Sequence, residues 1–143
     1  MAQALYIAEV QGKELYEKPG ITEDFGSRIP GYTKGGNQVA INFVCIARPG
    51  LDGKIRTLED DGKVYFKKHF AKFNGYNRTE YINVKETGIT MEVLEEYYRK
   101  QIARTSGLYI VKKEHLPLTR ESTNLKDFIK NALKYPEKYL EGF

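Results

Sequence analysis

The 143-residue sequence has no tryptophan, one cysteine and no long apolar run. Cys45 alone cannot form an internal disulfide, and a single thiol excludes a cysteine-rich metal site. No stretch approaches the roughly 18 uninterrupted apolar residues of a membrane-spanning helix. Residues 1–10 also lack the basic and apolar regions of a secretory signal. These absences predict a cytoplasmic protein that does not have a membrane as partner.

The composition is that of a soluble globular protein. Apolar residues make up 41% and charged residues 29% of the chain, which is sufficient for a hydrophobic core. A chain of this length suits one compact domain and is too short for two ordinary ones. We therefore expect a single domain over residues 1–143.

The charge is unevenly distributed along the chain. The net charge is only +4, but residues 1–27 contain five acidic and two basic residues. Residues 62–79, in contrast, contain five basic residues and no acid. Such segregation can create a surface potential that attracts phosphate groups. The alternative is an ordinary solvated surface with uneven charge.

Runs of apolar, aromatic and β-branched residues predict about five strands. They cover residues 4–10, 38–48, 63–67, 79–84 and 108–113. The run at 38–48 is apolar on both faces, which is typical of a central strand. The segment from residue 63 to 73 is ambiguous, because Phe66, Phe70 and Phe73 also fall at helical spacing. We favour a strand through about residue 67 that leads into a helical turn.

Two helices are predicted in the C-terminal half, at 91–104 and 125–135. Thr90 is placed to cap the first, and Ser122 or Thr123 the second. Residues 11–37 are dense in glycine and proline, which predicts a long loop. The residues from about 136 are expected to form a short C-terminal tail.

This order of elements predicts an α+β fold with a mainly antiparallel sheet or a small open barrel. The run Gly31–Pro49, GYTKGGNQVAINFVCIARP, resembles the early hairpin of single-stranded DNA-binding OB-folds. This resemblance implies an OB-like barrel as one form of the fold. It covers under a fifth of the chain and contains no diagnostic motif, so no functional residue is carried over from it.

The most suggestive segment for function is Lys63–Tyr81, where basic and aromatic residues alternate. Single-stranded nucleic acid is bound by such a mixture, because cations follow its backbone while rings stack on its bases. A lysine within the glycine-rich run at 31–37 could add a phosphate contact, although that run lacks the order of a P-loop. The expected nucleic-acid-binding residues are Lys34, Tyr65, Lys67, Lys68, Lys72, Tyr76, Arg78 and Tyr81. The three phenylalanines of this segment are expected to be core residues.

A second basic element is the row Lys126, Lys130 and Lys134, continued by Lys138. The first three stand four residues apart on one face of the predicted helix. Such a row could lie along a phosphate backbone. A solvated helix face is the more usual reason for this pattern.

The leading hypothesis is a small non-enzymatic protein that binds nucleic acid, prefers single strands and needs no cofactor or metal. The alternative is a protein-interaction or assembly module, such as a virion or mobile-element component, an inhibitor of a host protein or a homo-oligomer. A third hypothesis is an RNA-cleaving enzyme that uses His69 and His115 as general acid and base. An acidic Mg²⁺ site formed by Asp60–Asp61 with Glu59 or Glu80 is a weaker version of that hypothesis.

Overall fold

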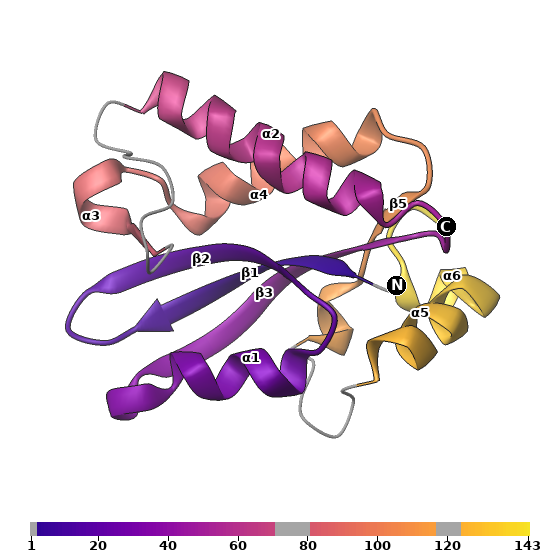
Figure 1. Ribbon diagram of the computed structural model, residues 1–143, viewed down its shortest axis with the longest axis horizontal. Helices are drawn as coiled ribbons and strands as arrows, with labels where there is room; N and C mark the ends of the chain where they lie inside the picture. Colours follow the sequence, from indigo (N-terminus) through magenta and orange to yellow (C-terminus); the bar gives the residue numbers. More distant parts are fainter. Residues whose placement is uncertain (1–2, 71–80, 117–123) are drawn as a thin grey trace.

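The computed structural model describes residues 3–70, 81–116 and 124–143, in which a five-stranded antiparallel sheet lies between two layers of helices (Figure 1). The order across the sheet is β4-β2-β1-β3-β5. The strands are β1 (Ala4–Gln11), β2 (Leu15–Thr22), β3 (Gln38–Ala47), β4 (Ile82–Asn83) and β5 (Leu108–Ile110). The α+β fold with an antiparallel sheet is thus confirmed, and the sheet is open.

Helices cover both faces of this sheet (Figure 1). The helical elements are α1 (Phe25–Tyr32), η1 (Lys34–Gly36), α2 (Gly53–His69), α3 (Val84–Thr87), α4 (Met91–Ala103), η2 (Lys113–His115), α5 (Leu125–Lys134) and α6 (Pro136–Tyr139). α2 and α4 pack on one face, whereas α1, α5 and α6 lie on the other. The two helices predicted in the C-terminal half, α4 and α5, are confirmed. Thr90 caps α4 as predicted, but α5 is capped by Asn124, whose side chain accepts a hydrogen bond from the Asp127 N–H, and not by Ser122 or Thr123.

Each face of the sheet has its own hydrophobic core, because successive side chains of a strand point to opposite faces. Leu5 and Ile7 of β1 belong to the core beneath α2 and α4. Tyr6 and Ala8 of the same strand belong to the core beneath α1 and α5. β3 is apolar on both faces for the same reason, as the sequence predicts for a central strand.

The strand predicted at 63–67 is wrong, since these residues belong to α2. The buried positions Ile55, Leu58, Glu59, Gly62 and Phe66 define one face of a helix. The alternation of apolar and polar residues that favoured a strand covers only the end of this helix. A glycine and two aspartates in its middle hide the longer helical pattern.

The loop predicted at 11–37 is also wrong, because it contains β2 and α1. β2 pairs with β1 along its whole length in spite of Pro19 and Gly20. Proline is tolerated because the outer edge of β2 pairs with β4 only at Tyr16 and Glu17. A Cβ atom on Gly20 would lie 2.8 Å from the Tyr6 hydroxyl oxygen, so the close approach of this buried ring favours glycine there.

α1 forms in a sequence with two glycines and an internal proline, all unfavourable in helices. Phe25, Ile29 and Tyr32 recur at helical spacing and pack against the core that contains Tyr6. Tertiary packing therefore outweighs the poor helix propensity. Because Gly31–Asn37 forms the end of α1 and the η1 turn, it is not a hairpin connection, and the OB-like barrel expected from this run does not form.

The strand predicted at 79–84 is confirmed only at Ile82–Asn83, and residues 79–80 lie outside the described residues. Asn83 ends the strand because its side chain accepts a hydrogen bond from the Glu86 backbone N–H at 3.0 Å and caps α3. No helix in residues 3–70, 81–116 and 124–143 is long and apolar enough to cross a membrane.

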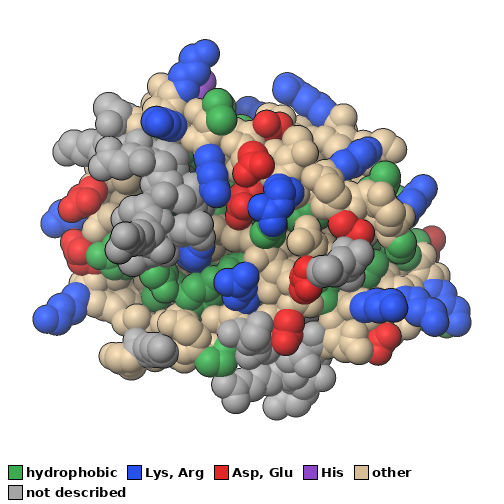
Figure 2. Space-filling model, in the orientation of Figure 1, with side chains coloured by type: hydrophobic (Ala, Val, Ile, Leu, Met, Phe, Trp, Pro, Cys, Tyr) green, Lys and Arg blue, Asp and Glu red, His purple; other side chains and the backbone are tan. Residues whose placement is uncertain are grey.

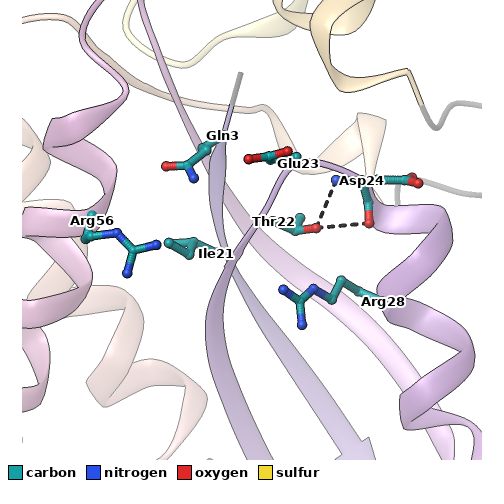
Figure 3. Close-up of a pocket in the computed structure, with 7 residues that line it drawn as sticks. All are labelled: Gln3, Ile21, Thr22, Glu23, Asp24, Arg28 and Arg56. Carbon is teal, nitrogen blue, oxygen red and sulfur yellow. Dashed lines mark hydrogen bonds between the residues drawn. The ribbon is translucent and has the colours of Figure 1, made fainter. Parts of the chain in front are cut away.

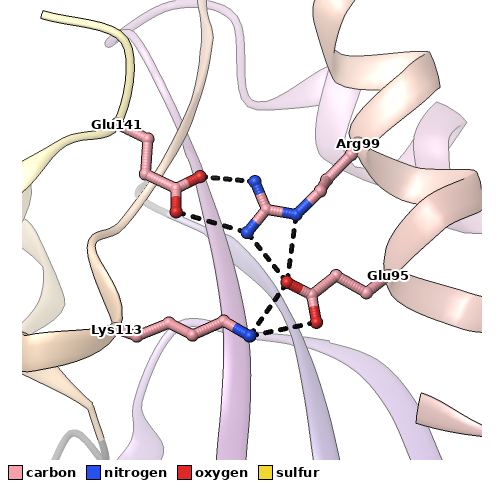
Figure 4. A network of polar contacts seen from close by, with 4 residues as sticks. All are labelled: Glu95, Arg99, Lys113 and Glu141. Carbon is pink, nitrogen blue, oxygen red and sulfur yellow. Dashed lines mark hydrogen bonds and ion pairs between the residues drawn. The ribbon is translucent and has the colours of Figure 1, made fainter. Parts of the chain in front are cut away.

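The C-terminal residues do not form the predicted tail, because they are attached to the sheet and to α4. Leu140 is fully buried and forms a β-bridge with Val111. Figure 4 shows Arg99 of α4 between two carboxylates: its guanidinium donates to Glu95 at 2.8 Å and to Glu141 at 3.2 Å. Partial burial opposes ionisation of Glu95, but hydrogen bonds from Arg99 and Lys113 outweigh it and lower its pKa.

Candidate nucleic-acid interface

Three of the predicted binding residues lie close together in the last turns of α2. Lys67 and Lys68 are exposed, and neither makes an ion pair with the described residues. One turn earlier, Lys63 lies 3.8 Å from Glu59 on the same helix. Figure 2 shows basic side chains next to a histidine where α2 ends. The end of α2 therefore presents positive charge without a neighbouring acid in its last two turns.

Tyr65, the third of these residues, contacts two other rings. Its ring centroid lies 4.5 Å from that of Tyr97, with an interplanar angle of 29°. The centroid of the His69 ring lies 4.4 Å from that of Tyr65, at 38°. Centroid distances this short are those of closely packed rings, and Tyr65 itself stays 38% exposed. Tyr97, Tyr65 and His69 form what we call the α2 ring stack, and His69 is its exposed outer member.

A close contact between α2 and α4 positions this stack. Gly62 faces Tyr98 of α4, and a Cβ atom there would lie 2.5 Å from the Tyr98 hydroxyl oxygen. Tyr98 is fully buried and stacks on Phe43 of β3, so it has little room to move. Glycine at this position lets the two helices approach closely, which brings Tyr97 against Tyr65.

Tyr81, predicted as a second stacking ring, lies on the opposite face of the sheet. It packs against the core beneath α1, with its ring centroid 5.8 Å from Tyr16 and 6.2 Å from Tyr32. Its neighbour Ile82 belongs to the core beneath α2 and α4. Burial raises the pKa of the Tyr81 hydroxyl. Tyr81 and Tyr65 therefore do not share a surface.

The other predicted binding residues cannot be placed in the same way. Lys72, Tyr76 and Arg78 lie outside the described residues. Lys34 begins the η1 turn, but its side chain is also outside the described part. Phe66 is buried, as expected of a core residue, and Phe70 packs against the same core.

The lysine row forms on α5 as the sequence predicts. Lys126, Lys130 and Lys134 are exposed on this helix. α5 packs on the opposite face of the sheet from α2. Lys134 lies over the ring of Tyr135, 5.4 Å from its centroid. The lysines of α2 and those of α5 are thus separated by the sheet.

The residues of the catalytic hypothesis are not assembled into a site. His69 belongs to α2, whereas the His115 ring packs on Tyr139, on the opposite face of the sheet. The His115 Nε2 atom also lies 2.9 Å from the Lys138 carbonyl oxygen. Of the Mg²⁺ candidates, Glu59 is buried and Glu80 lies outside the described residues. Across residues 3–70, 81–116 and 124–143, no three histidine, cysteine or acidic side chains are grouped to hold a metal.

Sequence reasoning missed a buried carboxyl group on β2. Glu17 is fully buried, and no donor group of the described residues bonds its carboxyl oxygens. Burial, together with the charge of Glu9 opposite it in the sheet and a hydrogen bond between the two side chains, raises the pKa of Glu17 to about 9. In the sequence, this group could have been found from the pairing of Glu9 with Glu17 across the hairpin of β1 and β2. That pairing becomes visible only when β2 is recognised as a strand.

Comparisons of the chain with protein-family models, with curated proteins and with solved structures find no match. The end of α2 combines charge, exposure and ordered rings, because its last two turns hold Lys67, Lys68 and two members of the α2 ring stack.

Proposed function

We propose that the protein binds single-stranded nucleic acid at the end of α2 and does not act as an enzyme. The observation that carries this proposal is that the last two turns of α2 hold both members of the α2 ring stack and two exposed lysines, which make no ion pair within the described residues. Cations attract the phosphate backbone and release its counterions. A flat ring offers each base a stacking surface whatever its sequence.

The side chains have different roles in this proposal. Lys67 and Lys68 contact phosphates, and the outer face of His69 receives a base. Tyr65 acts as the support of His69, with Tyr97 behind it, in place of the direct stacking role expected from the sequence. A ring that is already packed loses little freedom on binding, so less of the binding energy is spent on ordering it.

A preference for single strands follows from the same arrangement. In a duplex the faces of the bases are already stacked on one another, so a protein ring has access to them only in an unpaired strand. Lys72, Tyr76 and Arg78 follow α2 in the chain and stay proposed contacts on sequence grounds alone. Tyr81 is left out of the interface because it lies on the other face of the sheet.

Fluorescence anisotropy with labelled oligonucleotides at several salt concentrations tests the proposal. We expect the wild type to bind a single strand more tightly than a duplex of the same sequence. The variant Lys67→Ala with Lys68→Ala should bind the single strand more weakly. Its slope of log K against log salt should fall by about 1.4, because each lost phosphate contact removes about 0.7.

The matched control is Lys126→Ala with Lys130→Ala, which removes the same charge from α5 on the opposite face. This variant should retain most of the affinity and of the salt slope. No binding at low salt, or equal losses in the two double variants, would contradict the proposal. If light scattering instead showed a defined oligomer indifferent to oligonucleotides, the assembly hypothesis would replace it.

A further inference from the structure

A polar cavity of about 520 Å³ lies at the open edge of β2, between α1 and α2 (Figure 3). Its lining includes Gln3, Ile21, Thr22, Arg28 and Arg56. Arg56 precedes Lys67 by eleven residues on α2, which corresponds to about 16 Å along a helix. The cavity is therefore separate from the end of α2 and does not depend on the function proposed there.

Two arginines from different helices meet at this cavity. Arg28 comes from α1 and Arg56 from α2, and both guanidinium groups point toward Ile21 between them (Figure 3). Both side chains are exposed, and neither makes an ion pair with a residue of the described chain. Guanidinium groups bind phosphate and carboxylate through paired hydrogen bonds, with a geometry that lysine lacks.

The edge of β2 adds a backbone donor to the two arginines. β4 pairs with β2 only at Tyr16 and Glu17, so the later part of the strand has no partner on that side among the described residues. Pro19 has no N–H group and therefore faces this open edge. Ile21, two residues further on, points its backbone N–H the same way, since these groups alternate along a strand.

The two acidic residues of the lining do not neutralise the arginines. The Asp24 carboxylate points away from the guanidinium groups (Figure 3). The Asp24 backbone instead bonds the Thr22 hydroxyl, with both contacts at 2.9 Å. Glu23 lies near Gln3 at the other end of the lining. The part of the cavity around Ile21 therefore has positive charge and hydrogen-bond donors that are open to a ligand within the described part of the chain.

We propose that this cavity binds a phosphate monoester group, held by Arg28 and Arg56 with the Ile21 N–H. A doubly charged phosphate matches two guanidinium groups better than a singly charged carboxylate does. The volume suits a ligand the size of a mononucleotide. The same chemistry is offered by a free nucleotide and by the terminal phosphate of a nucleic-acid strand, and the experiment separates these two sources.

Isothermal titration calorimetry with inorganic phosphate and with adenosine monophosphate tests the free ligand. Arg28→Ala and Arg56→Ala should each weaken binding about tenfold or more, the effect of losing a charged hydrogen bond. Arg104→Ala is the matched control, because Arg104 is exposed at the end of α4 and does not line the cavity. All three side chains are on the surface, so circular dichroism should show intact folding.

The second arm compares one oligonucleotide with and without a 5′-phosphate. If the phosphate raises affinity in the wild type and not in Arg56→Ala, the strand terminus is the ligand. The oligonucleotide without the 5′-phosphate measures binding through the end of α2 alone. The added effect of the 5′-phosphate measures the cavity, so each proposal can fail without the other. The phosphate site is ruled out if neither phosphate, adenosine monophosphate nor the 5′-phosphate gives binding that depends on the two arginines. Equal weakening by Arg104→Ala would rule it out as well.

Discussion

The two faces of the sheet carry lysine-rich helices that differ in what surrounds the charge. At the end of α2, Lys67 and Lys68 share the last two turns of the helix with Tyr65 and His69 of the α2 ring stack. On α5, Lys126, Lys130 and Lys134 form a regular exposed row on an amphipathic helix. Both surfaces can attract phosphate. Lys134 of α5 lies over the ring of Tyr135, whereas the end of α2 carries the three rings of the α2 ring stack.

The buried polar groups beneath the two helix layers differ as well. On the α1 and α5 face, the hydroxyl groups of Tyr6 and Tyr32 form a hydrogen bond with each other. On the α2 and α4 face, the Glu17 carboxyl group faces another carboxyl group, that of Glu9, and no donor group of the described residues bonds it. The number of lysines does not distinguish the α2 surface from the α5 surface. The predictions below therefore test the packing of the rings and the buried polar groups.

The largest expected effect concerns Glu17. An acid whose pKa is about 9 in the folded protein and 4.5 in the unfolded chain binds more protons when folded. Stability from this group is fully present below pH 4.5 and is lost as the pH rises toward 9. At pH 7 the loss is on the order of 3 kcal/mol. This pH lies about 2.5 units above the pKa of the unfolded chain, and each unit corresponds to about 1.4 kcal/mol. Glu17→Gln should therefore stabilise the protein at neutral pH.

Chemical denaturation at pH 5 and pH 8 measures this effect. The gain from Glu17→Gln over the wild type should be larger at pH 8 than at pH 5. Glu137→Gln, an exposed acid on α6, should change stability little at either pH. A gain from Glu17→Gln that is absent or independent of pH would show that the carboxyl group is not held neutral beneath α2 and α4.

The next effect tests the contact that positions the α2 ring stack. Gly62→Ala should destabilise the fold by about 1–3 kcal/mol, because the new methyl group overlaps the buried Tyr98 hydroxyl. Gly53→Ala, at the start of the same helix, meets no atom within 4 Å and should be neutral or slightly stabilising. Thermal unfolding compares the two variants. Equal stability would mean that α2 and α4 need not approach closely at this point.

The smallest effect concerns the outer ring of the stack. His69→Ala should weaken single-strand binding by about 1 kcal/mol, at the lower end of the range for a lost base–ring contact, and His69→Phe should restore it. His115→Ala is the control on the other face of the sheet. Anisotropy titrations would contradict the stacking role if the two alanine variants bound equally well.

The parts of the fold predicted from sequence were those with regular local patterns. β1, β3, α4 and α5 have unbroken apolar patterns or clear capping residues, and each forms close to its expected bounds. β2, α1 and α2 were missed because glycine or proline interrupts each of them. Packing partners distant in the chain compensate for these residues, as Tyr6 does at Gly20 and Tyr98 at Gly62.

The candidate site was predictable in charge but not in geometry. Lys67 and Lys68 stand out in an acid-free run, and the structure leaves both exposed. The contact of Tyr65 with Tyr97 joins two helices that are more than twenty residues apart, so no local pattern could reveal it. Arg28 and Arg56 were missed for a related reason, since the elements that carry them were assigned to loops or turns.

The most direct test of the α2 interface is a titration of the ¹⁵N-labelled protein with a single-stranded oligonucleotide, followed by nuclear magnetic resonance. The account predicts that the backbone amide signals of residues 65–70 shift and saturate together, while those of residues 125–134 change little. Shifts confined to α5, or no shifts at the end of α2 at low salt, would contradict it.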